Sequence, residues 1–523
     1  MSTDASWSQG YVTDTLYTES YFRELSPVWL NYVAALNGCH PRPLDKEFTY
    51  IELGCGLGQS VNVNAGAFPH ARFYGVDFNP AHIDAAQRFA ARVGIANAQF
   101  LERSFQQLGQ VALPDFDFIV LHGVYSWISL EARQAVQRFI YDKLKPGGLV
   151  YNSYNCLPGW AADAPIRRLV FEFGASVSGS STHRIEQATK QIAELRDLKS
   201  GYFRANTPAT QQVDNLLKRQ ANYLAHEYLN ADWTLFYSAD VADEMAVAKL
   251  DYVGSATLVE NHLDLVLAEA AAAFVRKQPT ERLRQMMQDF SSGQRFRRDV
   301  FARGHAHLGQ GQIARNLRQL HFGTTKTMDE FTPKAKVPRG EITFDNALFP
   351  IIKDVLGLGS VTLEEIAAAV QPKSGKAADA ERAISLLVAA GHVVPTAQPF
   401  QAPKMPAGIA RMKLKSTVNQ AILALAAETV TRRVMVSTVA GSGINIEPVD
   451  ALFLLVLTGP KPPMDELAGR IALELKRRGV RISKLGEELK DEAATVAHVQ
   501  SLIKDFLAKG LPVLARLGVI EVA

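Results

Sequence analysis

Short apolar segments alternate with amphipathic ones over residues 48–150 of the chain. Five of these segments have the length and apolar content of buried strands, namely residues 48–53, 72–76, 98–101, 116–121 and 148–153. Residues 81–93 and 130–144, which lie between them, repeat their apolar positions with the period of a helix. Strands that alternate with helices predict a parallel sheet covered by helices, so we expect an α/β domain.

The pattern after residue 160 is mainly helical, with few segments that resemble strands. Helical spacing recurs in residues 165–173, 182–196, 209–227, 238–249, 256–277 and 280–291. A polar stretch with two prolines at residues 323–340 then predicts a linker. We therefore expect a helical domain between the α/β domain and this linker.

Two further domains are expected after the linker. Residues 341–398 contain three helical segments and a terminal strand, which predicts a winged-helix-like module; Thr362 and Glu365 have the spacing of a capping box at its second helix. Residues 399–406 are rich in proline and predict a second linker, and the remainder is helical apart from a turn at 441–445. The expected domains span residues 1–175, 176–330, 341–398 and 407–523.

The composition of the 523-residue chain excludes several classes of protein. Apolar residues make up 47% and charged residues 21%, which argues against a mainly disordered chain and against a coiled coil. The longest apolar stretches fall short of the roughly 20 residues that a membrane span needs, and the first residues lack the pattern of a secretory signal. The three cysteines lie far apart, so we expect no disulfide framework, no metal site and a cytoplasmic location.

The charge of the chain gives no indication of a nucleic-acid partner. The 56 basic and 53 acidic side chains leave a formal net charge of +3. Arg295, Arg297, Arg298 and Arg303 are close in sequence, but Asp299 interrupts them. We interpret this cluster as a solvated helix face or a set of domain-interface ion pairs, and we expect no nucleic-acid partner.

A glycine-rich loop after the first expected strand carries the clearest chemical signal. Glu52 precedes Gly54, Gly56 and Gly58, so that an acid stands two residues before the first glycine. The dinucleotide fingerprint G-x-G-x-x-G places its third glycine one position later and seats a pyrophosphate on a helix N-terminus. An acid at this point instead suits a ligand that is cationic there, such as the amino group of S-adenosylmethionine.

A second acid, Asp77, stands at the end of the second expected strand. It follows Gly58 at about the separation that a βαβ unit gives, and a carboxylate in this place can accept hydrogen bonds from both ribose hydroxyls. The loop, the two acids and the strand pattern together predict a site for a nucleoside ligand.

With these residues the sequence resembles the class I S-adenosylmethionine-dependent methyltransferases. Several phrases are similar to one subgroup, the enzymes with a methyltransferase regulatory domain, which includes rickettsial protein-lysine methyltransferases of outer-membrane proteins. Among these phrases are IELGCGLGQS (51–60), FDFIVLHGVYSWI (116–128), NYLAHEYLNADW (222–233) and DVADEMAVAKLDYVGSA (240–256). The resemblance implies a Rossmann-like, doubly wound, seven-stranded methyltransferase domain followed by mainly helical accessory domains.

The resemblance also implies roles for particular residues. Glu52 and the three glycines would hold the methionine end of the cofactor, and Asp77 the ribose with help from Asn79. The family often has an acid for the adenine after the third strand, but this chain has Ser104 there, so we assign the adenine to Ser104 and Phe105. His122, after the fourth strand, and Tyr17, in an amino-terminal lid with Tyr11 and Tyr21, complete the expected cofactor site.

Aromatic and amide side chains follow the fourth and fifth expected strands, where the methyl group would lie. We expect Tyr125, Tyr154, Asn155 and Trp160 to form the catalytic channel. Methyl transfer from a sulfonium is a direct displacement, so the enzyme must mainly align the reacting atoms. Aromatic walls would also lower the pKa of an amine nucleophile by desolvation and hold its methylated product.

The identity of the methyl acceptor is left open by the residues themselves. A lysine side chain of a protein follows from the resemblance; a small molecule or a peptide natural product is the alternative acceptor. A non-catalytic scaffold that binds S-adenosylmethionine, and more remotely a nicotinamide-dependent oxidoreductase, are the alternatives from other classes. A homodimer is also left open.

Overall fold

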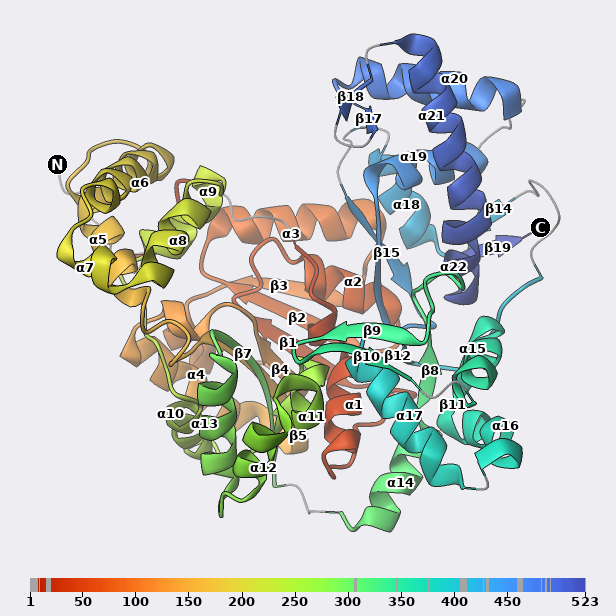
Figure 1. Ribbon diagram of the computed structural model, residues 1–523, viewed down its shortest axis with the longest axis horizontal. Helices are drawn as coiled ribbons and strands as arrows, with labels where there is room; N and C mark the ends of the chain where they lie inside the picture. The colour runs from red at the N-terminus through yellow and green to blue at the C-terminus, as the bar shows by residue number, and fades with distance from the viewer. Residues whose placement is uncertain are drawn as a thin grey trace.

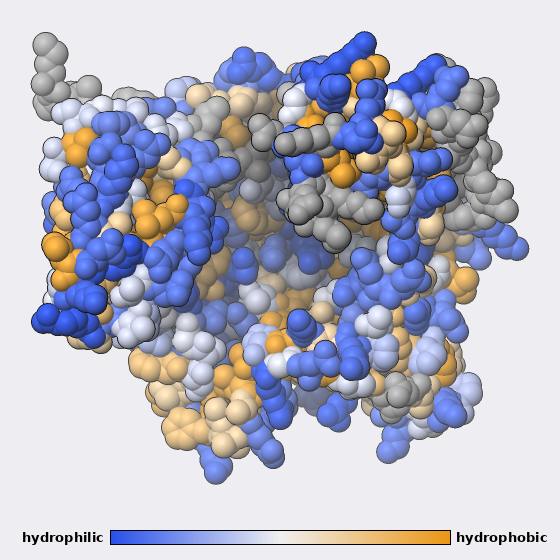
Figure 2. Space-filling view, turned by 45° about the horizontal axis from the view of Figure 1, so that its top comes forward, coloured by the Kyte–Doolittle hydropathy of each residue, from blue (hydrophilic) through white to orange (hydrophobic). Residues whose placement is uncertain are grey.

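The computed structural model describes most of the chain. The described residues are 8, 10–15, 20–304, 308–344, 347–374, 376–404, 412–426, 428, 432–458, 464–480, 482–484, 487–489 and 491–522. A central sheet is flanked by a helical lobe on one side and by two further α/β lobes on the other (Figure 1). One face of the molecule is hollowed between these flanking parts (Figure 2).

Seven strands of the described chain form the central sheet in the order β3-β2-β1-β4-β5-β7-β6. They are β1 (Thr49–Leu53), β2 (Arg72–Asp77), β3 (Ala98–Glu102), β4 (Phe116–Leu121), β5 (Leu144–Asn155), β6 (Leu250–Ser255) and β7 (Phe296–Arg303). β1 to β5 are parallel, and β7 runs antiparallel to both of its neighbours. The strand order reverses at β1 and β4, where a doubly wound sheet opens a crevice for its ligand. The predicted fold class is confirmed.

Both faces of the sheet are buried because successive strand residues point to opposite sides. Tyr50 packs with the helices α1 (Pro27–Leu36), α2 (Gln59–Ala67) and α3 (Pro80–Val93), whereas Ile51 packs with α4 (Leu130–Lys143) and α10 (Ser238–Ala246). All five residues of β1 are buried, which explains why this strand is recognisable as a short apolar run.

The last two strands lie in the segment expected to be mainly helical, outside its predicted helices, and neither was predicted as a strand. The arginine cluster at 295–303 therefore lies mostly on β7 and not on a helix face. Arg297 on β7 hides the strand signal, because it is buried with two acids instead of facing water. Its guanidinium contacts Asp289 at 2.5 Å and Asp299 at 3.0 Å. The sheet therefore extends beyond the expected domain boundary at residue 175.

A helical lobe does follow β5, as expected. It consists of α5 (Ala164–Ala175), α6 (Ser181–Asp197), α7 (Gly201–Ala205), α8 (Thr207–Leu216) and α9 (Ala221–Tyr228), drawn in orange to yellow-green in Figure 1. These helices share a hydrophobic core of their own, to which Ile166, Ile185 and Leu224 belong. Further helices, α11 (Leu263–Val266), α12 (Glu269–Arg276), α13 (Glu281–Ser292) and α14 (Gln310–Gln319), lie around β6 and β7 or lead on to the next lobe.

Three helices and a small sheet occupy the region expected to be a winged-helix-like module, and the sheet includes an earlier strand, β8 (His321–Gly323). The helices are α15 (Phe349–Gly357), α16 (Leu363–Ser374) and α17 (Ala377–Ala389), and the sheet also contains β11 (Gly359–Thr362), β12 (Val394–Thr396) and β13 (Phe400–Gln401). The capping box is confirmed, since the Thr362 N–H donates to Glu365 and the Glu365 N–H donates to Thr362 Oγ1. The expected linker holds a hairpin of β9 (Lys334–Val337) and β10 (Gly340–Thr343).

The C-terminal part combines helices with short hairpins. Its helices are α18 (Thr417–Ala426), α19 (Pro448–Thr458), α20 (Met464–Arg477), α21 (Glu492–Asp505) and α22 (Leu511–Arg516), the last two joined by a π-helical turn. Three strand pairs accompany them: β14 (Met412–Leu414) with β19 (Ile520–Val522), β15 (Arg433–Ser437) with β16 (Ser442–Ile446), and β17 (Ser483–Lys484) with β18 (Glu487–Glu488). The expected turn at 441–445 therefore lies in a hairpin, which packs on α2.

Within the described residues, no helix combines the length and the apolar content that crossing a bilayer requires.

Replacing Arg297 by methionine should destabilise the fold strongly. Asp289 and Asp299 would be left buried without their counter-ion, and breaking a buried pair in this way costs about 3–5 kcal/mol. We expect a lower midpoint in urea unfolding followed by fluorescence. The matched control is Arg88→Met, which removes an exposed i,i+4 pair with Asp84 and should change stability by less than about 1 kcal/mol. Equal effects of the two substitutions would contradict the assignment.

Candidate active site

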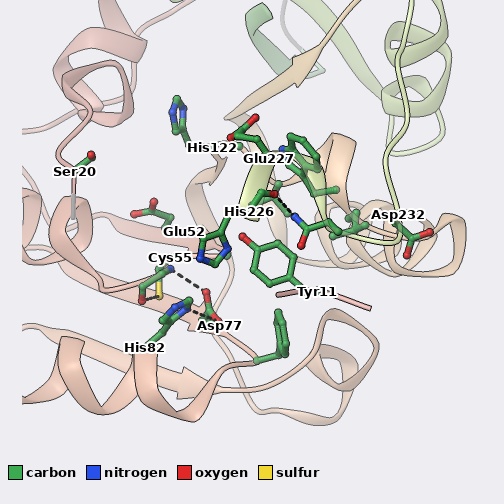
Figure 3. A pocket seen from close by; sticks show the side chains of 18 of the residues that line it. Tyr11, Ser20, Glu52, Cys55, Asp77, His82, His122, His226, Glu227 and Asp232 are labelled. Atoms are coloured by element: carbon green, nitrogen blue, oxygen red, sulfur yellow. Dashed lines mark hydrogen bonds and ion pairs between the residues drawn. The ribbon is translucent and has the colours of Figure 1, made fainter. Parts of the chain in front are cut away.

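A cavity of about 570 Å³ opens at the carboxyl ends of the parallel strands. One wall consists of the residues after β1, β2 and β4, among them Glu52, Gly56, Asp77 and His122. The facing wall comes from α9 and the residues just after it. The side chains labelled in Figure 3 converge on this space from both walls. A cavity of this size is typical of small-molecule and cofactor sites.

The glycine-rich loop turns the chain from β1 into α2 through left-handed backbone conformations. Gly58 has φ +69°, and a Cβ there would lie 2.6 Å from the Cβ of Ala86 on α3, so glycine lets the two helices pack closely. Gly56 has φ +52° and lines the cavity. Gly54 lines the cavity as well, whereas Gly58 supports the loop from behind.

Glu52 is a buried acid at the wall of the cavity. Its side chain lines the cavity while the residue is only 5% exposed, and its Oε2 atom has no hydrogen-bond partner among the described residues. Burial, together with the neighbouring Asp77 carboxylate, raises the pKa of Glu52 to about 8. A buried carboxylate of this kind is satisfied by a cationic ligand, as an amino group provides.

Asp77 is held in place by the surrounding backbone. Its Oδ2 accepts the Gly56 N–H and its Oδ1 accepts the Asn79 N–H, both at 2.9 Å, and His82 Nδ1 lies 3.3 Å from Oδ1. These bonds fix the carboxylate at the cavity wall with lone pairs left for hydroxyl donors. Asn79 does not line the cavity; its side chain accepts the Ala81 N–H and so caps α3.

Ser104 and Phe105 line the cavity beyond β3, as does Phe78 after β2. The Ser104 N–H donates to the Gln107 side chain at 3.0 Å, which fixes the turn that presents Phe105. Two rings on one wall suit a flat, aromatic ligand group such as adenine.

His122 lines the cavity but is already engaged on its protein side. Its Nδ1 lies 2.8 Å from the Tyr151 hydroxyl, and its ring centroid is 3.8 Å from that of Phe22. Burial lowers the pKa of His122 to about 3, with Arg298 contributing, so the ring is neutral. A neutral imidazole here shapes the cavity and adds no positive charge to it.

Asn155 and Trp160 reach the cavity after β5. The Asn155 Nδ2 group is buried and has no hydrogen-bond partner among the described residues, which leaves a donor for a ligand. Trp160 carries the Arg295 guanidinium over its ring at 4.4 Å, and Arg295 also pairs with Asp163. The indole face therefore already stabilises a cation at this edge of the cavity.

The other two residues expected in the catalytic channel lie elsewhere. Tyr125 and Tyr154 are fully buried and do not line the cavity. The Tyr125 hydroxyl donates to Glu244 at 2.5 Å, and the Tyr154 hydroxyl donates to Asp299 at 2.6 Å. Both rings belong to the hydrophobic core beneath the cavity. Tyr154 lies in β5, where alternate residues face opposite sides, and Tyr125 lies in a short 3-10 helix, Tyr125–Trp127, after β4.

The structure places one of the three tyrosines expected in an amino-terminal lid at the cavity. Tyr11 lines the cavity, and its ring packs against Phe78 and His226. Tyr21 turns away instead, and its oxygen accepts the Gly443 N–H of β16 at 2.7 Å, while the adjacent Phe22 enters the cavity. Tyr17 lies outside the described residues.

The sequence reasoning missed the wall opposite the cofactor loop. Five residues of the segment 223–232 line the cavity: Tyr223, His226, Glu227, Asn230 and Asp232. The helical spacing of this segment was visible, and Tyr223 and Glu227 are four residues apart on one helix face. What sequence could not show is that the lobe folds back over the sheet.

The fold and the site together define a class I S-adenosylmethionine-dependent methyltransferase. Residues 51–150 match the family described as a methyltransferase domain, and residues 220–303 match the one described as a predicted methyltransferase regulatory domain. An uncharacterized protein of Synechocystis sp. is 33% identical over 516 residues, which are 98% of this chain and 99% of that protein. The chain therefore belongs to the family of class I methyltransferases that carry this regulatory domain.

Two rickettsial proteins are also similar to this chain. An uncharacterized protein of Rickettsia prowazekii is 26% identical over 289 residues, 54% of this chain and 51% of that protein. The structure of PKMT2 from Rickettsia typhi in complex with AdoHcy has a TM-score of 0.72 and 19% identity, and covers 96% of this chain and 99% of the other. This structure confirms the fold over nearly the whole chain.

S-adenosylmethionine is the cofactor, and the residues present fit it. The unpartnered Glu52 carboxyl would hold the amino group, the Asp77 carboxylate would accept the ribose hydroxyls, and the rings beyond Asp77 suit the adenine. The predicted cofactor is confirmed; the contact of each residue with it remains our assignment.

Replacing Glu52 by glutamine should stabilise the empty protein and weaken cofactor binding. The folded pKa of about 8 lies above the ordinary 4.5, so the wild type loses stability as the pH rises from about 4.5 through 8. The variant has no such loss. At about pH 9 its free energy of unfolding should exceed that of the wild type by roughly 1–3 kcal/mol, and it should therefore unfold at a higher temperature; the gain at about pH 6 should be smaller. Calorimetry should show S-adenosylhomocysteine binding at least about tenfold weaker.

The control for this variant is Glu47→Gln, which removes an exposed carboxylate paired with Arg72. It should leave both properties nearly unchanged. Undiminished cofactor binding by the Glu52 variant would contradict its assignment to the amino group.

Proposed function

We propose that this methyltransferase acts on lysine side chains of a protein substrate. The supporting observation is the wall that faces the cofactor loop. This wall combines two acidic residues, Glu227 and Asp232, with the ring of Tyr223. Trp127 and Trp160 line the same cavity after β4 and β5. Carboxylates and aromatic faces together suit a cation at the end of an apolar stem, which describes a lysine side chain.

The chain's own residues would supply alignment and desolvation. S-adenosylmethionine, when bound, supplies a methyl group on a positively charged sulfur. Trp127 and Trp160 would exclude water from the acceptor amine, which lowers its pKa and favours the neutral nucleophile. The Asn155 side-chain amide, whose Nδ2 has no hydrogen-bond partner among the described residues, would help to align the acceptor amine with the methyl group. Tyr125 and Tyr154 would act indirectly, by holding in place the backbone of the neighbouring residues Ser126 and Asn155.

The comparisons support the same substrate class without reaching the substrate itself. The chain shares its fold with PKMT2 of Rickettsia typhi, and its phrases resemble the subgroup that contains protein-lysine methyltransferases. The accessory lobes around the hollowed face would then receive the substrate protein (Figure 2). The cytoplasmic location and a homodimer stay predictions.

Incubation with tritiated S-adenosylmethionine and a size-fractionated lysate would test the proposal. We expect label in the protein fraction, and acid hydrolysis should return it as methylated lysine. Asp77→Ala, which removes the expected ribose contact, is the control and should abolish the labelling. Label that appears only in the small-molecule fraction, or on residues other than lysine, would contradict a lysine acceptor.

A further inference from the structure

The cavity holds a carboxylate that the cofactor does not require. Glu227 lies in the last turn of α9, in the regulatory segment, and lines the same cavity as Glu52 and Asp77. Figure 3 shows its carboxylate turned into the cavity, on the side of His122. The cofactor carries one amino group and one ribose, which Glu52 and Asp77 already match. Glu227 is therefore left for a second ligand.

No hydrogen bond or ion pair satisfies Glu227 within the described part of the chain. Burial raises the pKa of its carboxyl to about 7, and the positive charge of Arg167 opposes this shift without forming an ion pair or hydrogen bond with it among the described residues. Arg167 itself donates to the Asn230 carbonyl at 2.5 Å and stacks over Trp233, so it is engaged elsewhere. A partly buried carboxylate without a counter-ion is satisfied when a cation enters.

The other basic side chains of the cavity do not supply that cation. Arg295 pairs with Asp163 and covers the Trp160 ring. Arg103 donates to the Glu102 carbonyl at 2.6 Å. Neither guanidinium forms an ion pair with Glu227 among the described residues, which leaves its carboxylate for an incoming ligand.

Helix α9 does not need this carboxylate in order to fold. The helix is anchored through Leu224, Ala225 and Tyr228, which are buried in the core of the helical lobe. Tyr223 stands one turn before Glu227 on the same face and lines the cavity beside it. An acid and an aromatic ring at this spacing can meet the charged end and the stem of one side chain.

We infer that Glu227 receives the ammonium group of the incoming lysine side chain and accepts its proton. This inference rests on the proposed function and adds the residue that selects an amine. The proton passes from the ammonium nitrogen to the carboxylate, which gives a neutral amine and a carboxylic acid. The nitrogen lone pair then forms the new bond to the methyl carbon, and the carbon–sulfur bond breaks with its electron pair left on sulfur.

The test measures binding of a lysine side-chain mimic rather than turnover. Protein saturated with S-adenosylhomocysteine is titrated calorimetrically with n-butylamine, which is protonated at neutral pH as lysine is, and with neutral 1-butanol. The wild type should bind the ammonium more tightly than the alcohol. Glu227→Gln should lose this preference by roughly tenfold or more, and Glu227→Asp should retain part of it.

A matched control is Glu186→Gln on α6, the helix against which α9 packs, where the carboxylate is exposed and outside the cavity. It should keep the wild-type preference. Affinity for S-adenosylhomocysteine should be unchanged in the Glu227 variants, which shows that the fold and the cofactor site are intact.

The outcomes separate this inference from the proposed function. Equal ammonium preference in wild type and Glu227→Gln, or no preference in the wild type, would overturn the role of Glu227 and leave the lysine proposal to the labelling experiment. A preference lost in Glu227→Gln, with no lysine label in any protein, would support the amine site and refute the protein acceptor.

Discussion

Two carboxylates buried side by side are the constraint around which the cofactor site is organised. Glu52 and Asp77 lie at the ends of the adjacent parallel strands β1 and β2, and burial, with a further contribution from the Asp77 charge, raises the pKa of Glu52 to about 8. The loop glycines let the backbone N–H of Gly56 reach Asp77, which fixes one of the two acids. The other acid keeps an unsatisfied oxygen, so the empty site is complementary to a ligand with a positive end and hydroxyl groups.

The remaining lobes complete this cavity and do not stand apart from it. The regulatory segment contributes the facing wall through α9 and the last two strands of the sheet through β6 and β7. The C-terminal part holds the segment that carries Phe22, since Gly443 donates to Tyr21 and Ser26 donates to the Gly441 carbonyl. Phe22 in turn packs on His122 at the cavity wall. The cofactor cavity and the accessory lobes are thus joined by short chains of contacts.

Much of the fold and most of the cofactor loop could be predicted from the local sequence, because both depend on short-range patterns of residues. The strands β1 to β5 are apolar runs, and the loop from Glu52 to Gly58 has its own spacing. The strand β7 escaped notice because Arg297 and Asp299 neutralise each other inside the protein, which a hydropathy pattern cannot register. Tyr125 and Tyr154 were expected in the channel because they lie near strand ends, but both rings pack in the core. The sequence shows where a strand ends, and it does not show which side of the sheet the rings beside that end will face. Glu227 was missed because its position depends on how a separate lobe folds back.

Whether Asp77 and Glu52 hold S-adenosylmethionine can be decided by a calorimetric titration. Wild-type protein and Asp77→Ala are titrated calorimetrically with S-adenosylhomocysteine and with NAD, after thermal unfolding has shown that both are folded. We expect the wild type to bind S-adenosylhomocysteine and not NAD. We expect the variant to bind S-adenosylhomocysteine at least about tenfold more weakly, because two charge-assisted hydrogen bonds are lost. Binding of NAD in place of S-adenosylhomocysteine, or equal affinity in the two proteins, would contradict the assignment of the two acids to this cofactor.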